Sequence, residues 1–512
     1  MHIARQSARG SVVLFVGNLG AAAIAAVASI IVARLLGPNE YGLYALALAG
    51  PSLLQYCTHF GTRTAVPRYV AYHTSRGESD KARRYAQASL FFALVTGIVF
   101  TIGSIAGSGW IADLLQRPSL QPYVALASLI ILGQSLLLTS IAASTGWNAM
   151  GQASLSNVVQ SGFRAVASPL LIILGFGIGG AVVGHATSYL VAGVASAGVL
   201  YFARIRPGTR SISEMASNAI ELIRFGFPPF IANLLTGVSV FYTSLLLSIV
   251  ANNATVGYYQ AATSLVIPAT LLSTSTTSAL YPAFASLQGI SGDLNAAFRM
   301  SVKYVGYLIV PILFFLATSS RELMRLFYGE SFVPGSFFLV LFSLSYAPIL
   351  VGLSVLPYFF NGIGRPRLTL YATGSSIAVL FVTAPLLSIF LGLKVQGLIY
   401  SIFISNAVLA AMGLAIVWRR KMGSVDVRSA LAVLFSSGIG LLTCSLIPSL
   451  GSDLLDLLAK FLVFAAIYLT LAPILGAVNK EDVKRIASSL RELRIIGPLL
   501  VPFLEYEMRL AS

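Results

Sequence analysis

Long apolar stretches, separated by short charged or Gly/Pro-containing segments, follow one another along the whole chain. They lie at about residues 11–35, 41–66, 86–109, 121–145, 153–176, 179–203, 225–250, 257–284, 300–320, 335–360, 368–393, 395–419, 429–449 and 455–478. A helix that crosses the hydrocarbon core of a bilayer takes about 20 apolar residues, and each stretch is long enough. The pattern predicts an all-α integral membrane protein with about 14 transmembrane helices.

The first of these stretches lies where a secretory signal peptide would lie. Its apolar run continues from Ser11 to about Leu36. The apolar core of a signal peptide is shorter, at about 7–15 residues. We therefore expect this stretch to be the first spanning helix, kept in the mature protein.

Composition agrees with a membrane location, since 57% of the residues are hydrophobic and only 10% are charged. Soluble domains carry roughly 25% charged residues. Most of the 33 Lys and Arg residues fall in segments that are cytoplasmic if the N-terminus is inside, and the outer segments hold only Arg34, Arg117, Arg321, Arg325 and Lys394. Because basic residues favour the cytoplasmic side, we expect a multi-pass plasma membrane protein with both termini in the cytoplasm. The net charge of +16 then reflects topology and requires no nucleic-acid partner.

The first six stretches and the next six share residues at equivalent positions. The shared residues include Arg9 and Arg224, Phe15 and Phe230, Asn18 and Asn233, Gly42 and Gly257, Tyr44 and Tyr259, Pro67 and Pro282, and Gly184 and Gly397. Chance recurrence of common residues is the alternative to a repeat. Since six is even, a repeat of this kind is parallel, and transporters built this way bind substrate between the halves. We expect an N-terminal lobe at 1–210, a C-terminal lobe at 211–421, two extra helices at 422–479 and a cytoplasmic tail at 480–512.

Catalytic and metal-binding signatures are missing from the sequence. No lysine follows a glycine, so there is no phosphate-binding loop of an ATPase. The histidines and cysteines show no metal-ligand spacing: His2, His59, His73, His185, Cys57 and Cys444. We therefore expect a protein that is not an enzyme and that holds no cofactor or metal.

Basic residues enter the apolar stretches, whereas Asp and Glu lie in loops, tails or stretch ends. Arg164 falls near the middle of 153–176, and His59 and Arg63 lie one helical turn apart in 41–66. An ionisable residue at membrane depth is costly and so indicates function. We propose these three residues as an anion-binding set in a central cavity. Arg63 as a cytoplasmic anchor, and His59 bonded to a backbone carbonyl, are the alternatives.

Other polar residues extend this hypothesis. Arg299 and Lys303 open the ninth stretch from the inside, as entrance cations or as ordinary interface anchors. A sugar would meet the polar side chains of Asn157, Gln160, Asn233 and Thr236. Lys460 lies four residues after Asp456, a spacing that predicts a local ion pair. Residues 480–497 carry Val483, Ile486, Leu490 and Leu493 on one helical face, which predicts an amphipathic helix on the cytoplasmic leaflet.

The segment from Ala33 to Tyr44, with the sequence ARLLGPNEYGLY, resembles the opening of polysaccharide-biosynthesis flippases. These belong to the multidrug/oligosaccharidyl-lipid/polysaccharide exporter superfamily. Similar landmarks occur at 256–262, 280–284, 327–330 and 362–366. The resemblance covers roughly residues 5–420 and implies two lobes around a central cavity. Gly37-Pro38 should break the first helix, with Tyr41 and Tyr44 as structural residues at the outer interface.

The resemblance and the acid-free interior together favour a flippase. It would move a lipid-diphosphate-linked oligosaccharide from the cytoplasmic to the outer leaflet by alternating access, because arginine binds phosphate oxygens in pairs. Its partners would be the lipid-linked glycan, membrane lipid, and glycosyltransferases or a polymerase of the same pathway. One alternative is a cation-coupled drug or metabolite exporter of the same superfamily, which predicts a carboxylate inside the membrane. A non-transporting membrane partner of glycan-assembly enzymes is the other.

Overall fold

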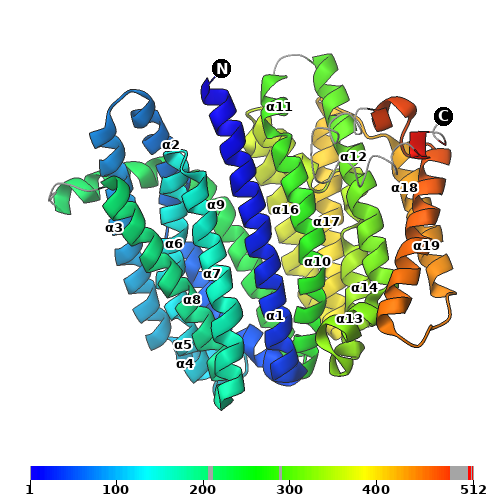
Figure 1. The fold of residues 1–512 in the computed structure, drawn as a ribbon, viewed down its shortest axis with the longest axis horizontal. Helices are drawn as coiled ribbons and strands as arrows, with labels where there is room; N and C mark the ends of the chain where they lie inside the picture. Colours follow the sequence, from blue (N-terminus) through cyan, green and yellow to red (C-terminus); the bar gives the residue numbers. More distant parts are fainter. Residues whose placement is uncertain (1, 206–211, 288–290, 485–505, 509, 511–512) are drawn as a thin grey trace. The chain divides into compact units, whose positions relative to one another are not determined.

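The computed structural model describes residues 2–205, 212–287, 291–484, 506–508 and 510, and these form two compact units (Figure 1). Unit 1 is Met1–Gln260 and unit 2 is Ala261–Ser512. Unit 1 contains α1 (His2–Cys57), α2 (Thr62–Ser75), α3 (Ser79–Ala106), α4 (Ser108–Leu114), α5 (Gln121–Ala127), α6 (Leu129–Gly146), α7 (Met150–Leu171), α8 (Gly177–Leu200), α9 (Ile212–Val250) and the start of α10 (Asn253–Ala279).

Unit 2 continues α10 and consists of helices as well. They are α11 (Tyr281–Ser286), α12 (Ser291–Thr318), α13 (Ser320–Tyr328), α14 (Ser336–Ser345), α15 (Val355–Gly362), α16 (Pro366–Pro385), α17 (Lys394–Arg419), α18 (Val427–Ser445) and α19 (Asp453–Ile474). The described residues contain no strand, so the predicted all-α fold is confirmed. Most of the predicted amphipathic helix at 480–497 lies outside the described residues.

Eleven helical stretches of the described residues are long and apolar enough to cross a membrane. Two of them are too long for one crossing: Val16–Cys57 has 42 residues and Met150–Ile205 has 56. The first breaks at Gly37 (φ 70°), and the second at Gly175 (φ 93°). Both glycines adopt backbone angles that other residues avoid, and Pro38 adds a residue without an N–H. The expected break at Gly37-Pro38 is confirmed, whereas the count of about 14 crossings stays a prediction.

The predicted second spanning stretch, 41–66, ends earlier than expected. Helix α1 stops at Cys57, and α2 starts at Thr62 after Gly61 in the left-handed region (φ 89°). Side chains hold the turn: the hydroxyl of Thr58 donates to the carbonyl of Gln55 (2.8 Å), and that of Thr62 to the carbonyl of His59 (2.8 Å). Such local bonds compete with helical ones.

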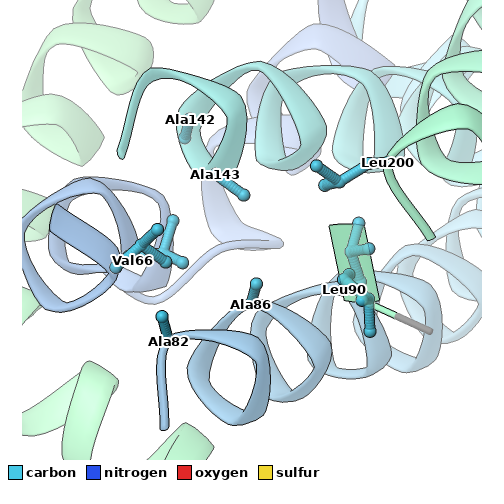
Figure 2. Close-up of a cluster of buried hydrophobic side chains, with 9 residues drawn as sticks. Val66, Ala82, Ala86, Leu90, Ala142, Ala143 and Leu200 are labelled. Carbon is cyan, nitrogen blue, oxygen red and sulfur yellow. The ribbon is translucent and has the colours of Figure 1, made fainter. Parts of the chain in front are cut away.

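Small residues let the helices of unit 1 pack closely. A buried cluster joins Val66 and Val70 of α2, Ala82, Ala86 and Leu90 of α3, Ala142 and Ala143 of α6, and Leu200 of α8 (Figure 2). Alanine is frequent in such clusters because lipid supplies no hydrophobic drive, and association then depends on close van der Waals packing. The polar network described below lies on α1, α7 and α8, so it shares only α8 with this cluster.

Helix α9 belongs to unit 1 because it packs on α1, α2 and α3. The contact division therefore falls at Gln260, and the predicted lobe boundary at 210/211 stays a prediction. A Cβ on Gly42 would lie 1.9 Å from the carbonyl oxygen of Asn253 and 2.9 Å from the backbone nitrogen of Gly257. Gly42 and Gly257 are equivalent residues of the proposed repeat.

A second close approach joins α2 to α9 and gives a test of the packing. A Cβ on Gly226 would lie 2.0 Å from the carbonyl oxygen of Gly61, which is backbone and cannot rotate away. We expect Gly226→Ala to lower stability by roughly 1–3 kcal/mol through overpacking. Gly103→Ala on α3 is the matched control, because its Cβ would meet nothing within 4 Å. Thermal unfolding of the purified protein measures both, and equal melting temperatures for the two variants would contradict the close packing.

Candidate functional site

Arg164 lies on α7 and reaches a tyrosine of α1. Its Nη2 donates to the hydroxyl oxygen of Tyr44 at 3.3 Å, and this hydroxyl lies 2.7 Å from Nδ1 of His185 on α8. Arginine is a donor only, so the tyrosine oxygen accepts from Arg164. The direction of the bond between Tyr44 and His185 depends on which ring nitrogen of His185 carries the hydrogen.

Aromatic rings surround this chain of hydrogen bonds. Tyr41 stacks on Tyr44 with ring centroids 6.0 Å apart and bonds to the hydroxyl of Ser29 at 2.9 Å. The ring of Tyr189 stacks on His185 at 5.5 Å. Tyr41 and Tyr44 are buried, at 1% and 3% exposure. We call this group the Arg164 network, formed by Ser29, Tyr41, Tyr44, Arg164, His185 and Tyr189.

Arg164 has no carboxylate partner among the described residues. Its Nε is buried and makes no hydrogen bond within the described part of the chain. In unit 2, by contrast, Lys303 pairs with Asp482 at 2.6 Å and Lys460 with Glu322 at 2.7 Å. A cation among spanning helices is costly when no opposite charge lies beside it. The Arg164 network is therefore a site that an anion would stabilise.

The other two predicted anion ligands differ from each other. Arg63 is half-buried in the first turn of α2 and makes no hydrogen bond or ion pair with the described residues. His59 is buried in the turn before α2, where Nδ1 accepts from the N–H of Gly61 at 3.0 Å and the ring packs edge-on against Phe230. The expectation that His59 and Arg63 share one helical face is wrong, because the helix ends at Cys57. Arg63 stays a candidate ligand, whereas the contacts of His59 shape the turn.

The predicted sugar contacts also separate. Gln160 is buried and donates to the hydroxyl of Ser188 at 3.0 Å, so its amide nitrogen joins α7 to α8. Asn157 bonds to Asn18 of α1 at 2.9 Å. Asn233 and Thr236 are exposed on α9, and the hydroxyl of Thr236 bonds within its own helix. Asn233 has the most available side chain of the four for a ligand.

Both predicted entrance cations lie beside carboxylates. Lys303 and Asp482 form a pair in which each side chain is 10% exposed. Arg299 is 3.9 Å from Asp426 and is largely exposed. The charge of Lys303 is thus neutralised in this structure, and an entrance role for it requires that this pair separate.

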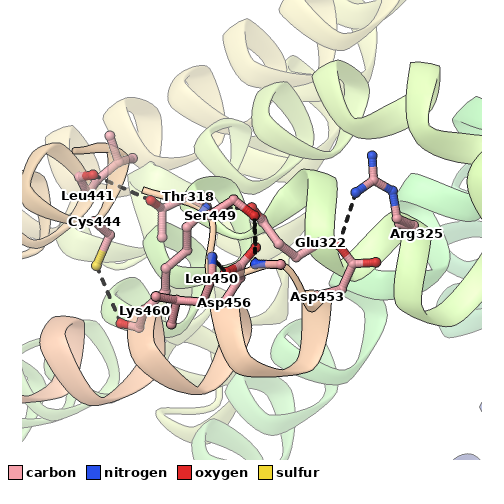
Figure 3. Close-up of polar contacts among 11 residues, drawn as sticks. Thr318, Glu322, Arg325, Leu441, Cys444, Ser449, Leu450, Asp453, Asp456 and Lys460 are labelled. Atoms are coloured by element: carbon pink, nitrogen blue, oxygen red, sulfur yellow. Dashed lines mark hydrogen bonds and ion pairs between the residues drawn. The ribbon is translucent and has the colours of Figure 1, made fainter. Parts of the chain in front are cut away.

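The predicted pairing of Lys460 with Asp456 is wrong. Asp456, in the first turn of α19, accepts from two residues of the loop before this helix: the N–H of Leu450 (2.6 Å) and the hydroxyl of Ser449 (2.9 Å) (Figure 3). Lys460 instead reaches Glu322 of α13. A carboxylate in the first helical turn is well placed to take backbone donors that have no helical partner, so Asp456 is already satisfied.

Sequence reasoning identified only Arg164 among the six residues of the network and missed the other five: Ser29, Tyr41, Tyr44, His185 and Tyr189. Tyr41 and Tyr44 were interpreted as residues of an outer turn, although their i, i+3 spacing places them on one helical face. His185 and Tyr189 share the i, i+4 relation on α8. No group of three potential metal ligands lies together within the described ranges.

Comparison with known proteins identifies the family. A family model described as polysaccharide biosynthesis protein matches residues 31–336. The chain belongs to the polysaccharide biosynthesis protein family. The resemblance seen in the sequence is thereby confirmed. Stage V sporulation protein B of Bacillus subtilis (strain 168) is 26% identical over 353 residues, which cover 63% of this chain and 67% of that protein.

Solved structures extend the identification to the fold of this family member. A structure titled lipid II flippase MurJ, inward closed conformation, superposes with a TM-score of 0.73 over 90% of this chain and 98% of that one, at 14% identity. An inward-facing multidrug resistance MATE family transporter of the MOP superfamily gives 0.63 over 78% and 94%, at 19% identity. At these identities the likeness establishes the fold: a multi-pass membrane protein built like MOP-superfamily transporters.

Proposed function

We propose that this polysaccharide biosynthesis protein is a flippase that moves lipid-diphosphate-linked oligosaccharide from the cytoplasmic to the outer leaflet by alternating access. The observation that carries the proposal is Arg164, a cation among spanning helices with no carboxylate partner in the described part of the chain. The family assignment and the fold shared with a structure titled as a lipid II flippase support it. The glycan would be the cargo of a chain that performs transport rather than chemistry.

The Arg164 network explains how a diphosphate would be held. The guanidinium presents donors in a rigid planar fork that matches phosphate oxygens. Within the described part of the chain, the guanidinium makes one hydrogen bond, a long one from Nη2 to a neutral hydroxyl. Phosphate oxygens would replace this weak contact by charge-assisted bonds. Tyr44, fixed by His185, would keep the guanidinium oriented. Arg63, also without a partner among the described residues, would add a second positive charge.

A cation-coupled exporter of the same fold is the main rival. It predicts a buried carboxylate that takes up sodium or a proton. No Asp or Glu of unit 1 is buried among the described residues, and the buried carboxylates of the described chain all lie in unit 2. The rival therefore gains no support from the site that contains Arg164.

The proposal places the protein in the plasma membrane with both termini in the cytoplasm. Glycosyltransferases or a polymerase of the same pathway would act before and after it. The basic residues of the predicted cytoplasmic segments support this orientation.

Energy coupling provides the test. Moving one charge across a membrane changes the free energy by about 2.3 kcal/mol per 100 mV, and a diphosphate carries about two charges. A membrane potential that is negative inside would favour outward transfer of the negatively charged headgroup. If the positive charges of the site neutralise the bound headgroup, the potential would instead favour the inward return of the empty, positively charged site. We expect flipping of a lipid-diphosphate glycan in proteoliposomes to respond to a potassium–valinomycin potential. A sodium or proton gradient at zero voltage should not drive it.

The same assay distinguishes a flippase from a cation-coupled exporter. Transport that requires a sodium gradient and ignores the potential would contradict the flippase proposal and favour the cation-coupled exporter. Protein-free liposomes, and proteoliposomes without valinomycin, control for leakage of the lipid and of charge.

A further inference from the structure

One face of α12 donates hydrogen bonds to acidic residues from the end of the chain. Nζ of Lys303 lies 2.6 Å from Asp482 Oδ2, and the hydroxyl of Tyr304 donates to Asp482 Oδ1 at 2.7 Å. Asp482 also accepts from the N–H of Asn479 at 3.1 Å. This part of the chain follows Asp453–Ile474, the last candidate span among the described residues, and it contacts α12 within the candidate span Leu294–Thr318.

One helical turn further along α12, a second carboxylate takes the next donor. The hydroxyl of Tyr307 donates to the carboxylate of Glu507, and Glu507 is buried, with 1% exposure. Tyr468 of α19 donates to the carbonyl of Tyr307 at 2.7 Å, and the two rings lie 5.5 Å apart. Beside Glu507 in sequence, Tyr506 contacts Thr470 of α19.

The two carboxylates therefore have different neighbours. Asp482 faces a lysine as well as a phenol, whereas no basic side chain of the described residues bonds to Glu507. A carboxylate is costly to bury without a positive partner. Protonation would remove that cost, since the neutral acid can be buried with fewer bonds.

We propose that a C-terminal segment, residues 479–484 and 506–508, docks onto the Lys303–Tyr304–Tyr307 face of α12 through two anchors. Asp482 is the anchor that stays paired at neutral pH, and Glu507 is the anchor that protonation controls, so that residues 506–508 dock reversibly. The docked segment neutralises Lys303 and occupies the donors of this face. The proposal depends on contacts within unit 2 and not on what the protein transports.

The direction of the pH response follows from the two anchors. Burial raises the pKa of Glu507 from its ordinary 4.5 to about 7, although the bond from Tyr307 lowers it. As pH rises above 4.5, Glu507 of the released segment loses its proton, whereas docked Glu507 keeps its proton up to about pH 7. Docking therefore weakens between these two pH values and is weakest above pH 7. Burial also raises the pKa of Asp482, but bonds from Lys303, Asn479 and Tyr304 outweigh burial and hold that pKa below its ordinary value. Its contribution is therefore kept at neutral pH and lost only in acid.

Because of this raised pKa, the docking equilibrium constant of residues 506–508 should be on the order of 100-fold lower above pH 7 than below pH 4.5. Near neutral pH, a small rise should therefore release residues 506–508 while Asp482 stays paired. Cysteine reactivity can measure this. The probe is a maleimide, and the labelled position is Met508→Cys in full-length protein with Cys57→Ser and Cys444→Ser, reconstituted in nanodiscs.

The matched control carries Glu507→Gln in the same background, because glutamine resembles the protonated acid and does not titrate. Dividing the two labelling rates at each pH removes the pH dependence of the thiol itself. We expect this ratio to rise by roughly tenfold between pH 6 and pH 8, with a midpoint near 7. A ratio that stays constant across this range would overturn the proposal.

A second variant tests the contact rather than the charge. Tyr307→Phe removes the hydroxyl that lowers the pKa of Glu507, so the midpoint should move to higher pH. Lys303→Gln should weaken docking at every pH without moving that midpoint. A Tyr307→Phe midpoint equal to that of the parent would show that Glu507 does not titrate at this site, and the proposal would fail.

Discussion

Replacing Arg164 by alanine is expected to abolish transport while the protein still inserts and accumulates. The side chain forms no ion pair with the described residues, and its one hydrogen bond, to Tyr44, is long at 3.3 Å. Removing it should therefore change stability little. A bond between a charged group and a ligand contributes about 1.5–3 kcal/mol, and more than one is lost here. A single such bond already corresponds to roughly 10- to 100-fold in affinity.

Conservative variants make this result specific. Arg164→Lys should restore transport only in part, because an ammonium lacks the planar fork. Tyr44→Phe should cause a smaller loss, since it removes the hydroxyl that orients the guanidinium but keeps the charge. Arg68→Ala is the control for loss of a positive charge in unit 1, because Arg68 stacks on Phe225 and is exposed. Glycan export in cells and flipping in proteoliposomes measure all four, and normal export by Arg164→Ala would remove the main support for an anion site.

Breaking the ion pair between Lys460 and Glu322 is expected to cause a large loss of stability. The two side chains are 12% and 14% exposed, and Lys460 also donates to the carbonyl of Thr318 (Figure 3). Glu322 Oε2 is already buried without a partner in the described chain. Lys460→Met would leave a carboxylate without its cation, which costs about 3–5 kcal/mol for a buried pair. The pair joins α19 to α13, so its loss should loosen the last two helices first.

A double-mutant cycle isolates this interaction. We expect Lys460→Met with Glu322→Leu to be clearly more stable than Lys460→Met alone, because an apolar pair requires no neutralisation. Glu330→Gln is the surface control: Glu330 pairs with Arg325 but is 72% exposed, so its loss should cost less than about 1 kcal/mol. Thermal unfolding in detergent measures each variant. If Lys460→Met unfolds at the same temperature as Glu330→Gln, the buried pair does not stabilise this region.

The site could be predicted only in part. Arg164 was found because a cation far from both ends of an apolar stretch stands out in any sequence. Its partners could not be found the same way, since Tyr44 and His185 are ordinary residues of membrane helices until packing brings α1, α7 and α8 together. Glu507 is the clearest case: its position in a charged tail predicts exposure, yet the structure buries it against Tyr307.

The sequence by itself determined which segments lie in the bilayer and which lie in water. It also determined the family and the main helix break. The bilayer core requires every backbone polar group to be bonded within a helix, so the length of an apolar stretch is enough to identify a spanning helix. Gly37-Pro38 breaks the first helix because proline has no N–H to donate. The tertiary structure decided where α1 ends, which carboxylate neutralises Lys460, and that Lys303 is paired while Arg164 is not. These outcomes depend on distances between residues far apart in the chain. Burial and pairing energies act over a few ångströms in space, and the order of residues does not fix such distances.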